Sequence, residues 1–280
     1  MINGKILIAG PCSVESRGQL LATVSGIMRY GDVDMIRCGV WKPRSRPGGF
    51  EGAGGEALRW MNDIRNEIPG VRYMVEVADT THVEQALSAG VEGVWFGART
   101  VCNPFMVQRL ADALRGCTVK VFVKNPMAPD LALWIGAIER VLRSGVRDVY
   151  AVHRGFATCL NGHLRNEPLW SLALSLREKM PDVPVICDPS HMAGRREYVE
   201  GLSATAMGLG LDGLMVECHV HPDDAMTDAS QQVTPQQLHE IVGRAIRCCG
   251  AMSAKAVVDK ELSSMIDELK KLRDEYTNNN

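Results

Sequence analysis

The chain has 280 residues, 46% of them apolar, so it can bury a substantial core as one large domain or two small ones. Its formal net charge of -2 excludes a broad basic surface for nucleic acid or an anionic membrane. It has no run of about 18 apolar residues, which argues against a membrane-spanning helix, and no convincing signal peptide.

Short apolar runs, of the kind that buried parallel strands display, alternate with helical segments along the chain. This alternation predicts an α/β fold with right-handed crossovers, and eight units favour a closed (β/α)8 TIM barrel over an open doubly wound sheet. The predicted strands are 5–10, 35–41, 73–78, 91–96, 119–123, 149–152, 183–187 and 213–217. The predicted helices are 19–29, 55–67, 81–89, 104–114, 129–143, 168–179, 195–209 and 235–248.

The alternation assigns residues 1–255 to a single barrel domain and leaves residues 256–280 outside it. Apolar residues in this last segment recur every three or four positions, which predicts an amphipathic C-terminal helix. This helix could pack on its own barrel, or it could meet another subunit or lead into a further domain. Its apolar residues are Leu262, Met265, Ile266, Leu269 and Leu272.

Residues of metal-binding type follow the first, seventh and eighth strands, whose ends are contiguous in a closed barrel. A mixture of soft and hard donors suits a divalent ion such as Mn, Co, Fe or Zn. His219 or His221 could replace the histidine of this set. The set consists of Cys12, His191, Glu217 and Asp228. The nine cysteines are scattered without CxxC pairs, as expected in a reducing cytoplasm, so we expect a cytoplasmic protein.

Basic residues follow the second, fourth, fifth and sixth strands. Their charges would repel one another at one face of a barrel unless anions joined them, and guanidinium groups bind phosphate and carboxylate bidentately. The pattern therefore predicts more than one anionic group in the substrate. These residues are Lys42, Arg44, Arg46, Arg99, Lys124 and Arg154. A glycine-rich loop at 48–55 could cover the site, but it lacks the Walker pattern.

Six strings, in order over residues 8–232, resemble the type I beta 3-deoxy-D-arabino-heptulosonate 7-phosphate (DAHP) synthases: GPCSVES, KPRS, GART, HRG, DPSH and VECHVHPDDAMTDASQQ. The resemblance implies a metal-dependent enzyme on a (β/α)8 barrel. It would condense phosphoenolpyruvate with erythrose 4-phosphate, the first step of the shikimate pathway and of aromatic amino acid biosynthesis. We also expect a homo-oligomer.

The resemblance also implies roles for single residues. The metal ligands would be Cys12, His191, Glu217 and Asp228. The catalytic lysines would be Lys42 and Lys124, either of which could deliver a proton to the developing alkoxide. The aldose phosphate would be held by Arg44, with Ser45 beside it, and the phosphate of phosphoenolpyruvate by Arg99 and Arg154.

The chain departs from the family pattern at three places. Asn125 follows the strand-five lysine where the family has arginine, which removes one positive charge. Thr100 replaces asparagine after the GAR motif, and Val220 replaces proline before His221. None of these changes removes an expected metal ligand.

Some relatives carry a C-terminal chorismate mutase domain, and the last helix resembles a connector to such a domain or partner. Two alternative functions stay open. One is 3-deoxy-manno-octulosonate 8-phosphate synthase, whose motif resembles KANRS where this chain has KPRS. The other is a non-catalytic regulatory partner of a chorismate mutase, although no ligand or phosphate-binding residue is missing.

Overall fold

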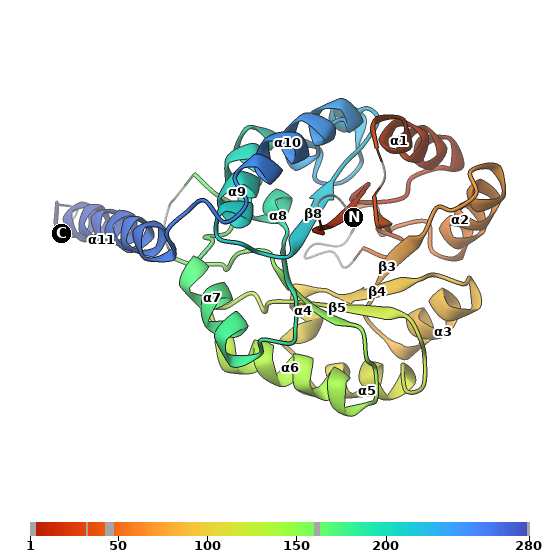
Figure 1. Cartoon of the computed structure of the whole chain (residues 1–280), viewed down its shortest axis with the longest axis horizontal. Coiled ribbons are helices and arrows are strands. Elements are labelled where there is room, and N and C mark those ends of the chain that lie inside the picture. Colours follow the sequence, from red (N-terminus) through yellow and green to blue (C-terminus); the bar gives the residue numbers. More distant parts are fainter. Residues whose placement is uncertain (1–3, 32, 43–47, 160–162, 279–280) are drawn as a thin grey trace.

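The computed structural model describes residues 4–31, 33–42, 48–159 and 163–278. Its strands form one closed barrel in the order β1 to β8, and all neighbouring pairs are parallel (Figure 1). Pairing of β8 with β1 closes the ring and confirms the predicted TIM barrel. The strands are β1 Ile6–Gly10, β2 Met35–Cys38, β3 Tyr73–Val77, β4 Gly93–Phe96, β5 Lys120–Lys124, β6 Val149–His153, β7 Val185–Cys187 and β8 Gly213–Glu217.

The predicted helices are all present, and no end is shifted by more than two residues. They are α1 Arg17–Tyr30, α2 Gly55–Glu67, α3 Thr80–Ser88, α5 Pro104–Ala113, α6 Leu131–Arg143, α7 Trp170–Lys179, α9 Arg196–Gly208 and α10 Pro235–Arg247. Two short helices were not predicted: α4 Ala98–Val101 and α8 Pro189–Ala193. Each begins two residues after a strand ends and carries a side chain into the site. Because both are so short, their sequences are not distinguishable from a loop.

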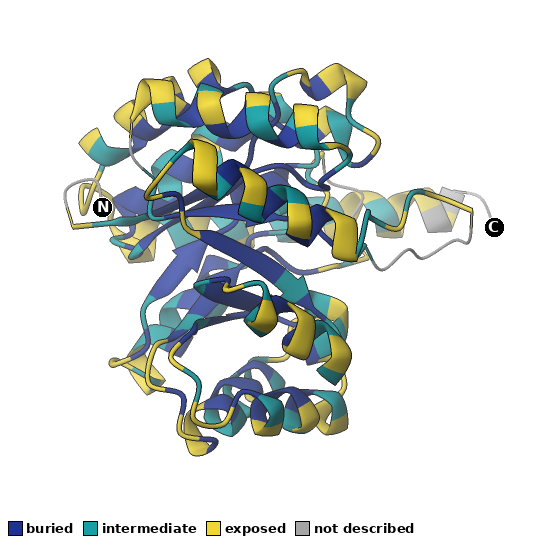
Figure 2. Ribbon diagram, turned by 90° about the vertical axis from the view of Figure 1, so that its right-hand side faces the viewer, coloured by how far each residue is buried: buried dark blue, intermediate teal, exposed yellow. Residues whose placement is uncertain are grey.

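Two apolar layers hold the barrel together. Inside it, each strand contributes one side chain to a packed plug: Ile8, Met35, Met74, Trp95, Phe122, Val152, Ile186 and Met215. Outside it, the other side of each strand packs against the helices, whose outer faces are exposed (Figure 2). Since both sides of every strand are buried, the strands read as continuous apolar runs.

Residues two positions beyond the plug point inward as well, because side chains alternate along a strand. They form the next layer towards the C-terminal ends of the strands, and most of them are charged. This layer consists of Gly10, Arg37, Glu76, Gly97, Lys124, Arg154, Asp188 and Glu217. The floor of the site is therefore built from charged groups that stand directly on an apolar plug.

A last helix, α11 Ala254–Asn278, extends away from the barrel (Figure 1). Near its start, Val257 and Val258 pack against the core, and the Glu261 carboxylate accepts the Trp170 backbone N–H at 2.9 Å. Farther along, Leu262, Ile266 and Leu269 are 48%, 52% and 49% exposed. The helix is thus as predicted, but packing of its apolar stripe on its own barrel is not found. None of the described helices is long and apolar enough to cross a membrane.

Deleting residues 256–280 should leave the barrel folded and change its association, because the stripe of α11 is apolar and half exposed. Sedimentation velocity should show a smaller species or less aggregation. Loss of the Glu261 cap on α7 should cost about 1 kcal/mol, a thermal shift of only a few degrees. Glu261→Ala is the matched control, since it removes the cap and keeps the stripe. Identical sedimentation of the full and shortened chains would contradict an association role.

Candidate active site

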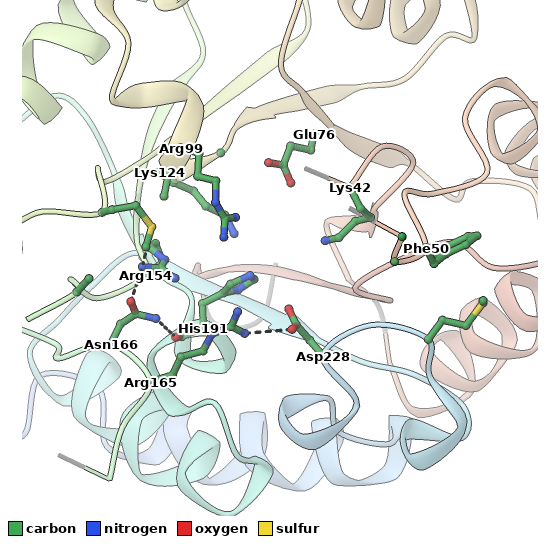
Figure 3. A pocket seen from close by; sticks show the side chains of 17 residues that line it. Lys42, Phe50, Glu76, Arg99, Lys124, Arg154, Arg165, Asn166, His191 and Asp228 are labelled. Carbon is green, nitrogen blue, oxygen red and sulfur yellow. Dashed lines mark hydrogen bonds and ion pairs between the residues drawn. The ribbon is translucent and has the colours of Figure 1, made fainter. Parts of the chain in front are cut away.

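A cavity of about 760 Å³ opens at the C-terminal ends of the strands. Its wall is strongly cationic, and it also carries two carboxylates and one histidine (Figure 3). In barrels of this type, the loops at this end carry the reactive groups. The labelled side chains are Lys42, Phe50, Glu76, Arg99, Lys124, Arg154, Arg165, Asn166, His191 and Asp228.

Beside this cavity, donor atoms of Cys12, Glu217 and Asp228 all lie within 4.8 Å of one another. The Sγ atom of Cys12 is 3.5 Å from Oδ2 of Asp228. The Nε2 atom of His191 is 3.7 Å from Oε1 of Glu217, next to the same group. The structure therefore brings together three of the four nominated ligands, Cys12, Glu217 and Asp228, and places His191 beside Glu217 but outside that group.

Neighbouring side chains fix these donors in place. Gln231 donates from Nε2 to Oε2 of Glu217 at 2.6 Å, and Arg37 lies 3.0 Å from the other oxygen in a fully buried ion pair. The backbone N–H of Cys12 donates to Oε1 of Gln232 at 3.0 Å. The SQQ string after Asp228 thus holds two of the expected ligands.

The electrostatics of the donor group fit a bound cation. Burial, together with the charge of Glu217, raises the pKa of the Cys12 thiol to about 12. Burial opposes ionisation of Asp228 too, but Arg165 and His191 outweigh it and hold the pKa of that carboxyl at about 2. The Cys12 thiol therefore stays protonated beside the two carboxylates, and a bound cation would favour its ionisation. Their mixture of sulfur, nitrogen and oxygen suits a borderline divalent metal.

The alternative histidines do not join this group. The Nδ1 atom of His219 accepts the backbone N–H of His221 at 3.0 Å. Neither residue is among the described donors that meet near Cys12. His191 is absent from that group as well, but its Nε2 atom lies 3.7 Å from Oε1 of Glu217.

Four of the six predicted basic residues line the cavity: Lys42, Arg99, Lys124 and Arg154. Arg154 is 5% exposed and donates from NH1 to Oδ1 of Asn166 at 2.8 Å. Arg44, Ser45 and Arg46 lie outside the described residues. The cationic wall surrounds enough space for a small substrate with several anionic groups.

Asn125, the departure from the family pattern, has a structural role. Its Oδ1 accepts the backbone N–H of Arg154 at 2.7 Å, and its Nδ2 donates to the carbonyls of Pro126 and Gly155 at 2.8 Å. It is completely buried and ties the end of β5 to the end of β6. Asn125 thus lacks the positive charge of an arginine, and its hydrogen bonds hold the backbone of Arg154 in place.

The two lysines differ in their electrostatic surroundings. Burial lowers the pKa of Lys124, and the nearby Asp188 only partly offsets this effect. Burial also acts on Lys42, but Cys12, Glu76 and Glu217 outweigh it and raise its pKa. Lys124 therefore gives up a proton more readily than Lys42.

Four charged residues of the site were not nominated from the sequence: Arg165, whose NH1 lies 3.2 Å from Oδ1 of Asp228, and three from the barrel interior, Arg37, Glu76 and Asp188. Arg37 contacts Glu217, and Glu76 lines the cavity beneath Gly97, where a Cβ would lie 2.1 Å from its Oε1. All three belong to the inward layer above the plug. A charged residue within an apolar strand run, or directly after one, could have indicated these site residues from the sequence.

The match to a sequence model of the DAHP synthetase I family covers residues 3–245. A phospho-2-dehydro-3-deoxyheptonate aldolase of Thermotoga maritima is 28% identical over 249 residues, which is 89% of this chain and 71% of the relative. A 2-dehydro-3-deoxyphosphooctonate aldolase of Bradyrhizobium is 24% identical over 84% of this chain and 85% of the relative.

Among solved structures, the crystal structure of a Thermotoga maritima DAHP synthase superposes with a TM-score of 0.78 at 27% identity. The superposition covers 88% of this chain and 69% of that one. A truncated form of a synthase from the same organism gives a TM-score of 0.73 at 24% identity, covering 88% and 87%, and this similarity bears on the fold alone.

Proposed function

The chain belongs to the DAHP synthetase I family, and from this premise we propose that it condenses phosphoenolpyruvate with D-erythrose 4-phosphate to DAHP and phosphate. The observation that carries the proposal is the juxtaposition of the Cys12–Glu217–Asp228 donor group with a cationic cavity. The donors suit a metal that polarises a carbonyl, and the cavity suits a pair of phosphorylated substrates.

Phosphoenolpyruvate is the substrate that we assign to the basic residues of the cavity. Arg99 and Arg154 can hold its phosphate, and the fixed orientation of Arg154 favours bidentate binding. Positioning is a large part of the catalytic effect, since C3 of an enol phosphate is a weak nucleophile. The sequence resemblance assigns the aldose phosphate to Arg44, with Ser45 beside it.

A divalent metal held by Cys12, His191, Glu217 and Asp228 would act as a Lewis acid on the aldehyde. Lys124 is our choice for the group that delivers a proton to the developing alkoxide, because burial lowers its pKa. Lys42 stays positively charged beside the donor group and balances anionic charge on the substrates. Attack of C3 leaves positive charge at C2, which water captures before phosphate departs.

The second candidate is condensation with a five-carbon aldose phosphate, because relatives named 2-dehydro-3-deoxyphosphooctonate aldolase match most of the chain. The test is a comparison of kcat/KM for erythrose 4-phosphate and arabinose 5-phosphate with phosphoenolpyruvate as co-substrate. We expect erythrose 4-phosphate to be preferred at least about tenfold, a difference of about 1.4 kcal/mol in transition-state binding. A preference for arabinose 5-phosphate would assign the protein to the octulosonate branch.

We also propose that the protein is a homo-oligomer and that α11 connects the barrel to a chorismate mutase domain or partner. The exposed residues Leu262, Ile266 and Leu269 support a protein contact on this helix. Binding to a separately prepared chorismate mutase, before and after deletion of α11, separates this role from self-association.

A further inference from the structure

Asp188 stands between the two chemical halves of the site. It follows β7, is completely buried, and its backbone N–H donates to the carbonyl of His153 at 2.7 Å. Its Oδ2 atom lies 2.8 Å from Nζ of Lys124 and also 2.8 Å from Nδ1 of His191. Its other oxygen, Oδ1, accepts the backbone N–H of His191 at 3.1 Å. One carboxylate thus binds the lysine of the cavity and the histidine of the donor group.

We propose that Asp188 is a positioning residue that sets the ring of His191 for metal binding and holds Lys124 at the substrate. This inference deepens the proposed function and rests on it for the identity of the ligands. Nothing in the motif pattern assigned a role to this side chain, which the sequence analysis treated only as part of the DPSH string.

The position of Asp188 fixes the tautomer of His191. The contact is not aligned as a hydrogen bond, but two lone pairs facing each other at 2.8 Å would repel, so the ring nitrogen beside the carboxylate oxygen carries the hydrogen. Nδ1 of His191 is therefore the protonated nitrogen, and the lone pair of the neutral ring lies on Nε2. Nε2 is the atom that faces Glu217, at 3.7 Å from Oε1. A carboxylate that fixes a histidine in this way is a recurring support of metal ligands.

Lys124 is 4% exposed and has its Nζ atom at the same carboxylate oxygen. A buried ammonium group needs a fixed partner, and Asp188 provides it without taking Lys124 out of the cavity wall. Because both contacts share Oδ2, displacing the carboxylate disturbs the ligand and the lysine together.

Replacement of Asp188 by asparagine tests the hydrogen-bonding role of the carboxylate without changing the size of the side chain. The amide keeps the size of the side chain but has one oxygen instead of two, so it cannot accept from Lys124 and from both donors of His191. If its nitrogen faces Nδ1, the ring must accept there and carry its hydrogen on Nε2, which blocks metal ligation. The chain offers a matched control at the other end of β7, where Asp212 accepts the backbone N–H of Val185 at 2.8 Å.

The test measures Co²⁺ binding to the full chain, by titration against a chromophoric chelator and by the thiolate-to-cobalt absorption band from Cys12. Asp188→Asn should bind Co²⁺ about 10–100-fold more weakly than the wild type. Asp212→Asn should keep the wild-type affinity and band, although it is the same chemical change. Wild-type Co²⁺ affinity in Asp188→Asn would overturn the proposal.

A second measurement needs no Asp188 variant and so does not depend on how well one folds. In the metal-free wild type labelled with ¹⁵N-histidine, the His191 signal, assigned by its absence in His191→Ala, should show hydrogen on Nδ1. Hydrogen on Nε2 would also overturn the proposal. Both measurements omit the substrates. Absence of turnover with intact Co²⁺ binding and the expected tautomer would therefore count against the proposed function alone.

Discussion

Replacing Cys12 with alanine is expected to reduce turnover by about 100-fold or more while the barrel stays folded. Loss of an outer-shell partner of a metal ligand alone typically costs 10–100-fold, and Cys12 is placed to be a ligand itself. The side chain lies directly after β1, at the end of the barrel where changes affect chemistry more than stability. His191→Ala should behave in the same way, because its Nε2 lies beside the same group.

The matched control is Cys38→Ala. Cys38 is equally buried but lies on β2 in the apolar layer between the strands and the helices. Its replacement should cost some stability, as a truncation in a packed core does, and leave the metal content unchanged. The assignment of Cys12 would be wrong if Cys12→Ala kept wild-type kinetics, or if Cys38→Ala lost metal to the same extent.

Removal of divalent metal is expected to abolish turnover, and Mn²⁺, Co²⁺, Fe²⁺ or Zn²⁺ should restore it. The donors are a buried thiol, two carboxylates and a neighbouring histidine, a mixture of sulfur, oxygen and nitrogen that suits a borderline divalent metal. Binding should also stabilise the fold by about 2.7 kcal/mol at a free metal concentration of 100 times Kd, which differential scanning calorimetry can measure.

Undiminished activity after exhaustive chelation, with metal content confirmed near zero by elemental analysis, would contradict this account. The calorimetric reading adds an independent control, since it needs no substrate. A chelated protein that unfolds at the same temperature with and without added metal would show that the donor group binds none of these ions.

Much of the fold could be predicted because a barrel strand is buried on both sides. Each strand must then be a short apolar run, and each run stands out from the amphipathic helices. The short helices α4 and α8 escaped because four or five residues have no periodicity to detect. Prediction of helix starts at Pro129 and Pro168 was wrong by two residues, since α6 begins after an Asp130 cap and α7 at Trp170.

The site was predicted mainly where motifs lie at strand ends. Glu76 was overlooked as a site residue because it lies inside its strand, where alternation turns it into the barrel. Asp188 was noted only as part of the DPSH string. Its side chain contacts Lys124, 64 positions away, and His191, three positions away. The Lys124 contact depends on the closed ring and cannot be read from spacing, whereas the His191 contact belongs to the local cap of α8. We expected protein to cover the apolar stripe of α11, but in the single chain Leu262, Ile266 and Leu269 are about half exposed.

We propose that this barrel joins phosphoenolpyruvate to an aldose phosphate with the help of a metal. The most direct test incubates metal-reconstituted protein with phosphoenolpyruvate and erythrose 4-phosphate and follows both phosphoenolpyruvate loss and phosphate release. We predict one phosphate released for each phosphoenolpyruvate consumed, with DAHP as the product. If neither erythrose 4-phosphate nor arabinose 5-phosphate led to any consumption of phosphoenolpyruvate by folded, metal-loaded protein, the proposed function would be contradicted.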